Sequence, residues 1–91
     1  MRHAGPEALD QLEPLITRIR ALPGLVEKQR GTFYRKSRAF LHFHEDPPSP
    51  ESLGGLFADI RVEGDDFERI DVTGPDGADR LVALARAHVE P

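Results

Sequence analysis

Polar and apolar residues alternate along the middle of the chain. In residues 38–45 and 56–62, every second side chain belongs to an apolar series. A period of two is typical of a β-strand with one buried face, because successive strand side chains point to opposite sides. Two further runs, 32–36 and 67–72, are rich in β-forming residues or alternate in the same way. The pattern therefore predicts four strands.

Turn-forming residues separate these four strands. Lys36-Ser37 is expected to form a tight turn, and residues 63–66 a hairpin turn. Residues 46–55 hold three prolines and two glycines, a density that only a loop tolerates. Strands joined in this way pair as antiparallel neighbours.

A helical pattern flanks the strands on each side. Apolar residues recur three and four apart over residues 8–22, and Leu22-Pro23-Gly24 ends that helix. Pro14 leaves two possibilities: a helix from about residue 7 that is kinked there, or a helix that begins at Pro14. Near the C-terminus, Thr73 is expected to cap a helix with Pro75 in its first turn. Residues 25–31 are interpreted as a connector, and residues 1–6 as disordered.

These elements predict one small α+β domain over residues 1–91. The simplest structure that buries every apolar stripe is a two-layer sandwich, in which a four-stranded antiparallel meander carries the N- and C-terminal helices on one face. The element order is α-β-β-β-β-α. The face expected under the helices is aliphatic, with these residues: Ala39, Leu41, Phe43, Leu56, Ala58, Ile60, Val62, Ile70 and Val72.

Composition narrows the class of protein. The 91 residues include no cysteine, which excludes disulfides, cysteine-ligated metals and thiol catalysis. Charged residues make up 31%, and no apolar run approaches the roughly 18 residues that span a bilayer. The first residues lack the apolar core of a secretion signal, so a cytoplasmic location is expected.

Charge is distributed unevenly. Residues 1–44 carry a formal charge of +4 and residues 45–91 a charge of −8. Such blocks either mark an interaction surface or neutralise each other across the sheet. The net charge of −4 gives no general attraction for nucleic acid.

Four segments carry a further pattern: Arg20-Ala21-Leu22-Pro23-Gly24-Leu25-Val26-Glu27, Gly31-Thr32-Phe33-Tyr34-Arg35, Ala39-Phe40-Leu41-His42-Phe43 and the C-terminal helix. Together they resemble the MmcQ/YjbR-like family of small bacterial proteins. The resemblance spans roughly residues 8–90 and implies a frataxin-like α+β sandwich. Some family members carry a predicted DNA-binding label, and the family brings no catalytic residues.

The sheet face opposite the aliphatic one is the expected working surface. Three phenylalanines with polar neighbours give it an apolar centre and a polar rim, as at many protein interfaces. A non-enzymatic binding domain that uses this open face for a protein partner or self-association is therefore the leading functional hypothesis, with loop 46–55 folded over the phenylalanines as the competing explanation. The expected residues are Phe40, His42, His44, Phe57, Asp59, Arg61, Phe67 and Arg69.

Two alternatives remain open. Arg35, Lys36 and Arg38, beside aromatic residues, are candidates for binding an anion or nucleic acid, although basic residues also protect a sheet edge from aggregation. His42 and His44 lie two residues apart, the spacing that places two imidazoles on one strand face. With Asp59 they form a possible metal or acid–base site, while a partly exposed sheet face is the simpler explanation. No cofactor motif is recognised.

Overall fold

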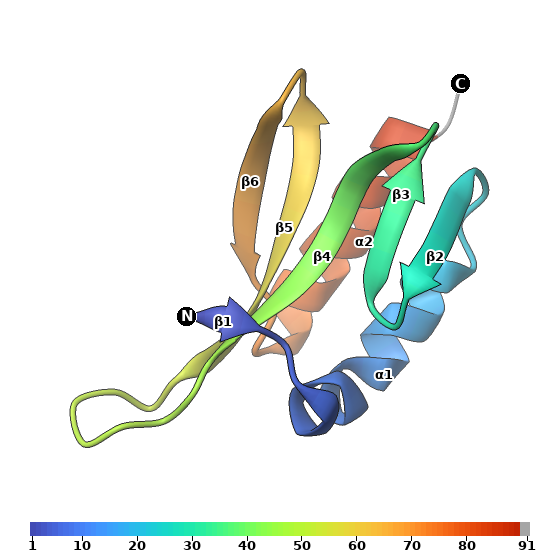
Figure 1. Cartoon of the computed structure of the whole chain (residues 1–91). Helices are drawn as coiled ribbons and strands as arrows, with labels where there is room; N and C mark the ends of the chain where they lie inside the picture. The colour runs from blue at the N-terminus through green and yellow to red at the C-terminus, as the bar shows by residue number, and fades with distance from the viewer. Residues whose placement is uncertain (90–91) are drawn as a thin grey trace.

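The chain folds into two helices and an antiparallel sheet, so its fold class is α+β (Figure 1). The computed structural model describes residues 1–89. The elements follow one another as β1 (Arg2–His3), α1 (Pro6–Arg20), β2 (Leu25–Gln29), β3 (Thr32–Arg35), β4 (Arg38–Asp46), β5 (Gly55–Glu63), β6 (Asp66–Asp71) and α2 (Pro75–Val89).

The sheet has six strands, not the four predicted. Its order is β2-β3-β4-β5-β6, and β1 pairs separately with the C-terminal end of β4. The expected connector 25–31 is therefore mostly strand β2, which lies at the sheet edge. The expected disorder at residues 1–6 was also wrong, since Arg2 and His3 pair with β4. Both strands lack a long alternating pattern, because β2 is largely exposed and β1 has two residues.

The first helix starts close to residue 7, one of the two predicted starts, and Thr73 has another role than the predicted cap of the second helix. α1 begins at Pro6 and continues through Pro14, so a helix that starts at Pro14 is excluded. α2 begins at Pro75, and Thr73 lies before it in a different role from the expected cap. The Thr73 hydroxyl accepts a hydrogen bond from the Leu56 amide at 3.0 Å and so ties the helix entry to β5.

The core lies between the helices and one face of the sheet. In Figure 1 both helices lie behind the sheet, and their buried residues belong to the same hydrophobic cluster as those of the strands. The fully buried side chains of this cluster are Ile16, Ile19, Leu41, Ala58, Ile60, Leu81 and Ala85. The aliphatic face was predicted correctly for β5, β6 and the second half of β4.

A β-bulge in β4 changes the faces of its first residues. Phe33 lies opposite Leu41 and Tyr34 opposite Ala39, so Phe40 is an extra residue in β4. Phe40 is 4% exposed and joins the core, where the alternation placed it on the open face. The expectation for Phe40 was wrong, because strict alternation does not survive a bulge.

The β4–β5 connection extends away from the body of the domain (Figure 1). Ser49 and Ser52 pair within it, and Leu53 near its end is 97% exposed. This loop therefore does not cover the open face. The alternative hypothesis, in which loop 46–55 folds over the phenylalanines of that face, is wrong. Within the described residues, no helix is both long and apolar enough to span a bilayer.

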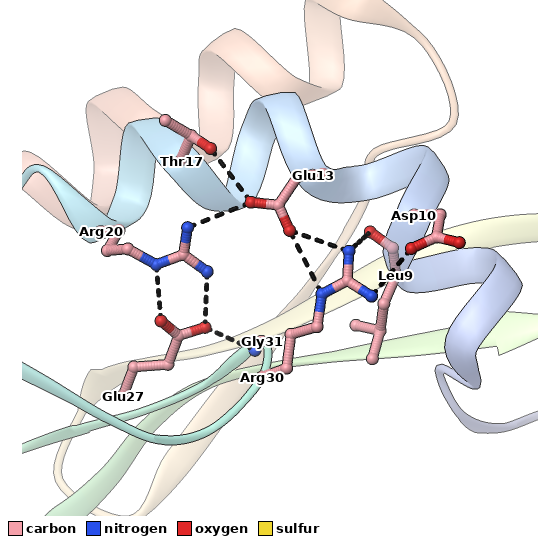
Figure 2. Close-up of polar contacts among 8 residues, drawn as sticks. All are labelled: Leu9, Asp10, Glu13, Thr17, Arg20, Glu27, Arg30 and Gly31. Carbon is pink, nitrogen blue, oxygen red and sulfur yellow. Dashed lines mark hydrogen bonds and ion pairs between the residues drawn. The ribbon is translucent and has the colours of Figure 1, made fainter.

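Five charged residues join α1 to the β2–β3 hairpin (Figure 2). Arg20 binds Glu27 through two hydrogen bonds of 2.6 and 3.0 Å, and Glu27 accepts a third from the Gly31 amide. Glu13 of α1 bridges Arg20 and Arg30. Arg30 also reaches Asp10. The first half of the chain thus neutralises much of its own positive charge.

Candidate functional site

The open face of the sheet presents polar side chains in cross-strand rows. His44 lies opposite His3 on one side and Phe57 on the other. In the next row, His42 lies opposite Asp59 and Asp59 opposite Arg69. Antiparallel partners on the same face are close enough for their side chains to interact. The register thus brings together residues that are far apart in the sequence.

Three histidines converge on this face. His3 arrives on β1, and its ring centroid lies 4.7 Å from that of His44 and 5.7 Å from that of His42. The His42 and His44 rings are 4.7 Å apart in an edge-to-face arrangement. One nitrogen from each ring can be chosen so that all three lie within 4.8 Å of one another.

Two imidazole nitrogens in this cluster are buried without a partner. Among residues 1–89, His42 Nδ1 and His44 Nε2 find no hydrogen-bond partner. His44 Nε2 lies 3.2 Å from Asp59 Oδ2, but the two atoms are not aligned for a hydrogen bond. A buried polar atom that stays unsatisfied costs about 1–3 kcal/mol, so a ligand that engages these two nitrogens would be stabilising.

Asp59 is held by Arg69 rather than by a histidine. The Arg69 guanidinium donates to both carboxylate oxygens, at 2.8 and 2.9 Å. This bidentate contact holds the pKa of Asp59 below its usual range, so the carboxylate remains charged at neutral pH. Asp59 thereby places a fixed negative charge beside His44.

His42 and His44 are kept neutral at neutral pH. Burial lowers the pKa of His42, and the neighbouring His44 adds to this effect. Burial also lowers the pKa of His44, against the opposing influence of Asp59. Near neutral pH both rings therefore have a free lone pair, which is the form of histidine that binds a metal.

The remaining predicted residues of the open face lie beside the histidines. Phe67 is 37% exposed, and its ring lies tilted against that of His42 with 5.3 Å between the centroids. The Arg61 guanidinium lies over the Phe67 ring, 4.5 Å from its centroid. Phe57 is only half-buried. With Phe40 in the core, Phe57 and Phe67 are what remains of the predicted apolar centre. The protein-interaction hypothesis stays a prediction.

The predicted basic residues lie at a different place. Arg35, Lys36 and Arg38 surround the β3–β4 turn, where they line a cavity with Arg61 and His88. Arg38 also pairs with Asp65 in the β5–β6 turn. It is one of the places where a basic residue of the first half of the chain meets an acidic residue of the second half, as Arg18 and Asp79 do elsewhere.

His3 is the residue that the sequence analysis missed. Its strand has two residues, and a lone histidine ahead of a helix gives no periodic signal. His3 joins the cluster because β1 pairs with β4. In that pairing Arg2 lies opposite Glu45 and His3 lies opposite His44. Comparisons with protein-family models, with curated proteins and with solved structures give no match for this chain.

Proposed function

We propose that this domain binds a single divalent transition-metal ion, with Zn²⁺ as the best match, through His3, His42 and His44. The observation that carries the proposal is the convergence of three imidazoles on one sheet face, two of them with a buried and unpartnered nitrogen. Imidazole suits Zn²⁺, Cu²⁺ and Ni²⁺, whereas Ca²⁺ and Mg²⁺ prefer oxygen ligands.

The spacing of the nitrogens suits such an ion after a small adjustment. Three atoms no more than 4.8 Å apart share a centre within about 2.8 Å of each, and zinc–nitrogen bonds are about 2.0–2.1 Å long. Each ligand atom therefore has to move inward by less than ~1 Å. Small side-chain rotations supply this movement, and His3 is exposed enough to make it.

Asp59 has two possible roles at this site. In a tetrahedral zinc site neighbouring ligand atoms are about 3.3 Å apart, close to the 3.2 Å between His44 Nε2 and Asp59 Oδ2. The sequence offered Asp59 as a third ligand beside His42 and His44. With His3 present it would be a fourth ligand, which requires one oxygen to loosen its contact with Arg69. If it keeps both contacts, it orients His44 and adds favourable charge from outside the coordination sphere.

The binding test uses the chain without a histidine tag, stripped of metal. Titration with Zn²⁺ in competition with a chromogenic chelator is expected to give one equivalent of bound metal. His42→Ala and His44→Ala should each weaken affinity at least about 100-fold, since a lost ligand costs more than the 10–100-fold typical of an outer-sphere partner. His3→Ala should weaken it as well, and Asp59→Asn less than any ligand variant.

His88→Ala is the matched control. His88 is the fourth histidine of the chain, lies on α2 and contacts the Leu84 carbonyl instead of the cluster. It should leave zinc affinity unchanged. Equal binding by the wild type and the His42→Ala/His44→Ala double variant would contradict the proposal, as would the absence of stoichiometric binding in a wild type that circular dichroism shows to be folded.

A further inference from the structure

A cavity with a surplus of cationic side chains lies apart from the histidine cluster. It has a volume of about 240 Å³ and lies between the turn ends of the β3–β4 and β5–β6 hairpins. Here we call it the hairpin cleft. Its cationic lining comprises Arg35, Lys36, Arg38 and Arg61, and Glu63 is the one carboxylate that lines it within the described part of the chain. The surplus of positive charge is local, because the whole chain has a net charge of −4.

The cleft forms where the pairing of β4 with β5 ends. Their register runs from Asp46 opposite Gly55 to Leu41 opposite Ile60, and the bulged Phe40 follows. Figure 1 shows the two strands diverging beyond this point, with α2 behind the opening. Phe40 and Val62 give the cleft apolar walls, and His88 of α2 contributes to its lining.

Arg61 spans this opening and is held in place. It donates to the Ala39 carbonyl at 2.7 Å, to the Gly64 carbonyl at 3.1 Å and to the exposed Asp65 carboxylate at 3.4 Å, so it bridges β4 to the β5–β6 turn. Its side chain is 19% exposed. A fixed and half-buried guanidinium is a pre-organised anion contact, since little freedom remains to be lost on binding.

The β3–β4 turn brings further cations to the mouth of the cleft. Lys36 and Ser37 both have positive φ, of 52° and 67°, in a two-residue turn where Asn-Gly is the favoured sequence. Among residues 1–89, neither Arg35 nor Lys36 forms an ion pair, and the carboxylate paired with Arg38, Asp65, is itself exposed. Lys36 thus occupies a strained backbone position beside Arg35, which has no ion-pair partner. Strain of this kind often marks a functional residue, and here it points to an anion contact for the Lys36 ammonium group.

We infer that the hairpin cleft binds a small phosphate monoester. Several guanidinium and ammonium groups around one opening match a dianion with three acceptor oxygens better than a single carboxylate. The volume limits the ligand to a small molecule. A polyanion would also meet the acidic β5–β6 hairpin, whose strands and turn carry Asp59, Glu63, Asp65, Asp66, Glu68 and Asp71.

The test is a two-dimensional amide NMR titration of the metal-free full chain. The probes are phenyl phosphate and inorganic phosphate, with sodium chloride at the same ionic strength as the reference. The amides of Lys36, Ser37 and Gly64 are expected to shift in a saturable way with phenyl phosphate. Lys36→Gln and Arg35→Gln should each weaken that binding at least about fivefold.

Lys28→Gln is the matched control, because Lys28 lies over the Tyr34 ring and outside the cleft. It removes the same charge and should leave the affinity unchanged. An equal loss in Lys28→Gln would overturn the inference, since the binding would then follow net charge alone. So would the absence of saturable shifts at 50 mM phenyl phosphate. Tighter, salt-dependent binding of a single-stranded oligonucleotide through the same residues would overturn it in favour of a nucleic-acid surface.

Discussion

Ile60 shows how strongly one buried side chain supports this small domain. It is completely buried on β5, opposite Leu41 of β4, between the sheet and the helices. Ile60→Ala is expected to reduce the free energy of unfolding by about 2–5 kcal/mol, because it removes buried methylene groups and leaves a cavity. Urea denaturation followed by circular dichroism measures the loss.

A milder core variant and an exposed control variant test the same prediction. Ile60→Val should cost about 0.5–1.5 kcal/mol and remain measurable if the alanine variant fails to fold. Leu53→Ala removes similar atoms from a side chain that is 97% exposed and should change stability by less than about 0.5 kcal/mol. Equal losses at Ile60 and Leu53 would contradict the observed core.

Individual residues were predictable where the alternation is unbroken. Ala58, Ile60 and Ile70 lie in the core as the period of two requires. Phe40 does not follow it, because a bulge adds one residue without a distinctive sequence signal. The bulge removes Phe40 from the open face and, in the same step, opens the cleft that Arg61 bridges.

At the level of elements, the entry of α2 depends on one close backbone approach. A Cβ atom at Gly77 would lie 1.8 Å from the Asp71 carbonyl oxygen, at the end of β6. Gly77→Ala is therefore expected to destabilise the fold by about 1–3 kcal/mol, although alanine in a helix interior normally gains up to ~1 kcal/mol over glycine. Thermal unfolding in parallel with urea denaturation measures the change.

Gly74 provides the internal control for this substitution. A Cβ atom there meets no atom within 4 Å, and Gly74 directly precedes Pro75, the first residue of the same helix. Gly74→Ala should shift stability by less than about 0.5 kcal/mol. If Gly77→Ala proved as stable as the wild type, α2 would not be packed this closely against the end of β6.

Elements with strong periodicity could be predicted, and short or exposed ones could not. The two helices and strands β3 to β6 carry stripes that must be buried, so their existence follows from the residues. β2 is an exposed edge strand, and β1 is held by contacts with β4 alone. Because His3 arrives on β1, the histidine pair could be read from the sequence and the triad could not.

Ion pairs join the helix layer to the sheet layer of the molecule. Arg20 and Glu27 pair α1 with β2, and Glu13 extends the network to Arg30 (Figure 2). The opposing charge blocks were predicted either to mark an interaction surface or to neutralise each other across the sheet. Arg38 and Asp65 form such a neutralising pair, whereas Arg30 is neutralised from α1. Sequence alone shows the blocks, and the helix placement decides which residues pair.

This arrangement makes stability sensitive to acid. The Arg20 guanidinium lowers the pKa of Glu27, and the Gly31 amide lowers it further. Because the folded-state pKa lies below the ordinary value of 4.5, the contact stabilises the fold at neutral pH and is lost as the pH falls from about 4.5 through the folded-state pKa. The same sign applies to the other carboxyl groups with a lowered pKa, which are Glu13, Glu45, Asp59 and Asp71.

Glu27→Gln should therefore cost about 1 kcal/mol at pH 7, since Arg20 is partly exposed and water screens the pair. The cost should shrink as the pH falls below 4.5 toward the folded-state pKa of Glu27, because the wild type loses the same contact there. Urea denaturation at each pH measures both chains. Glu51→Gln, in the extended loop, should follow the wild type at every pH. A constant difference between Glu27→Gln and the wild type down to pH 3 would mean that the Glu27 carboxylate contributes through its shape and not through its charge.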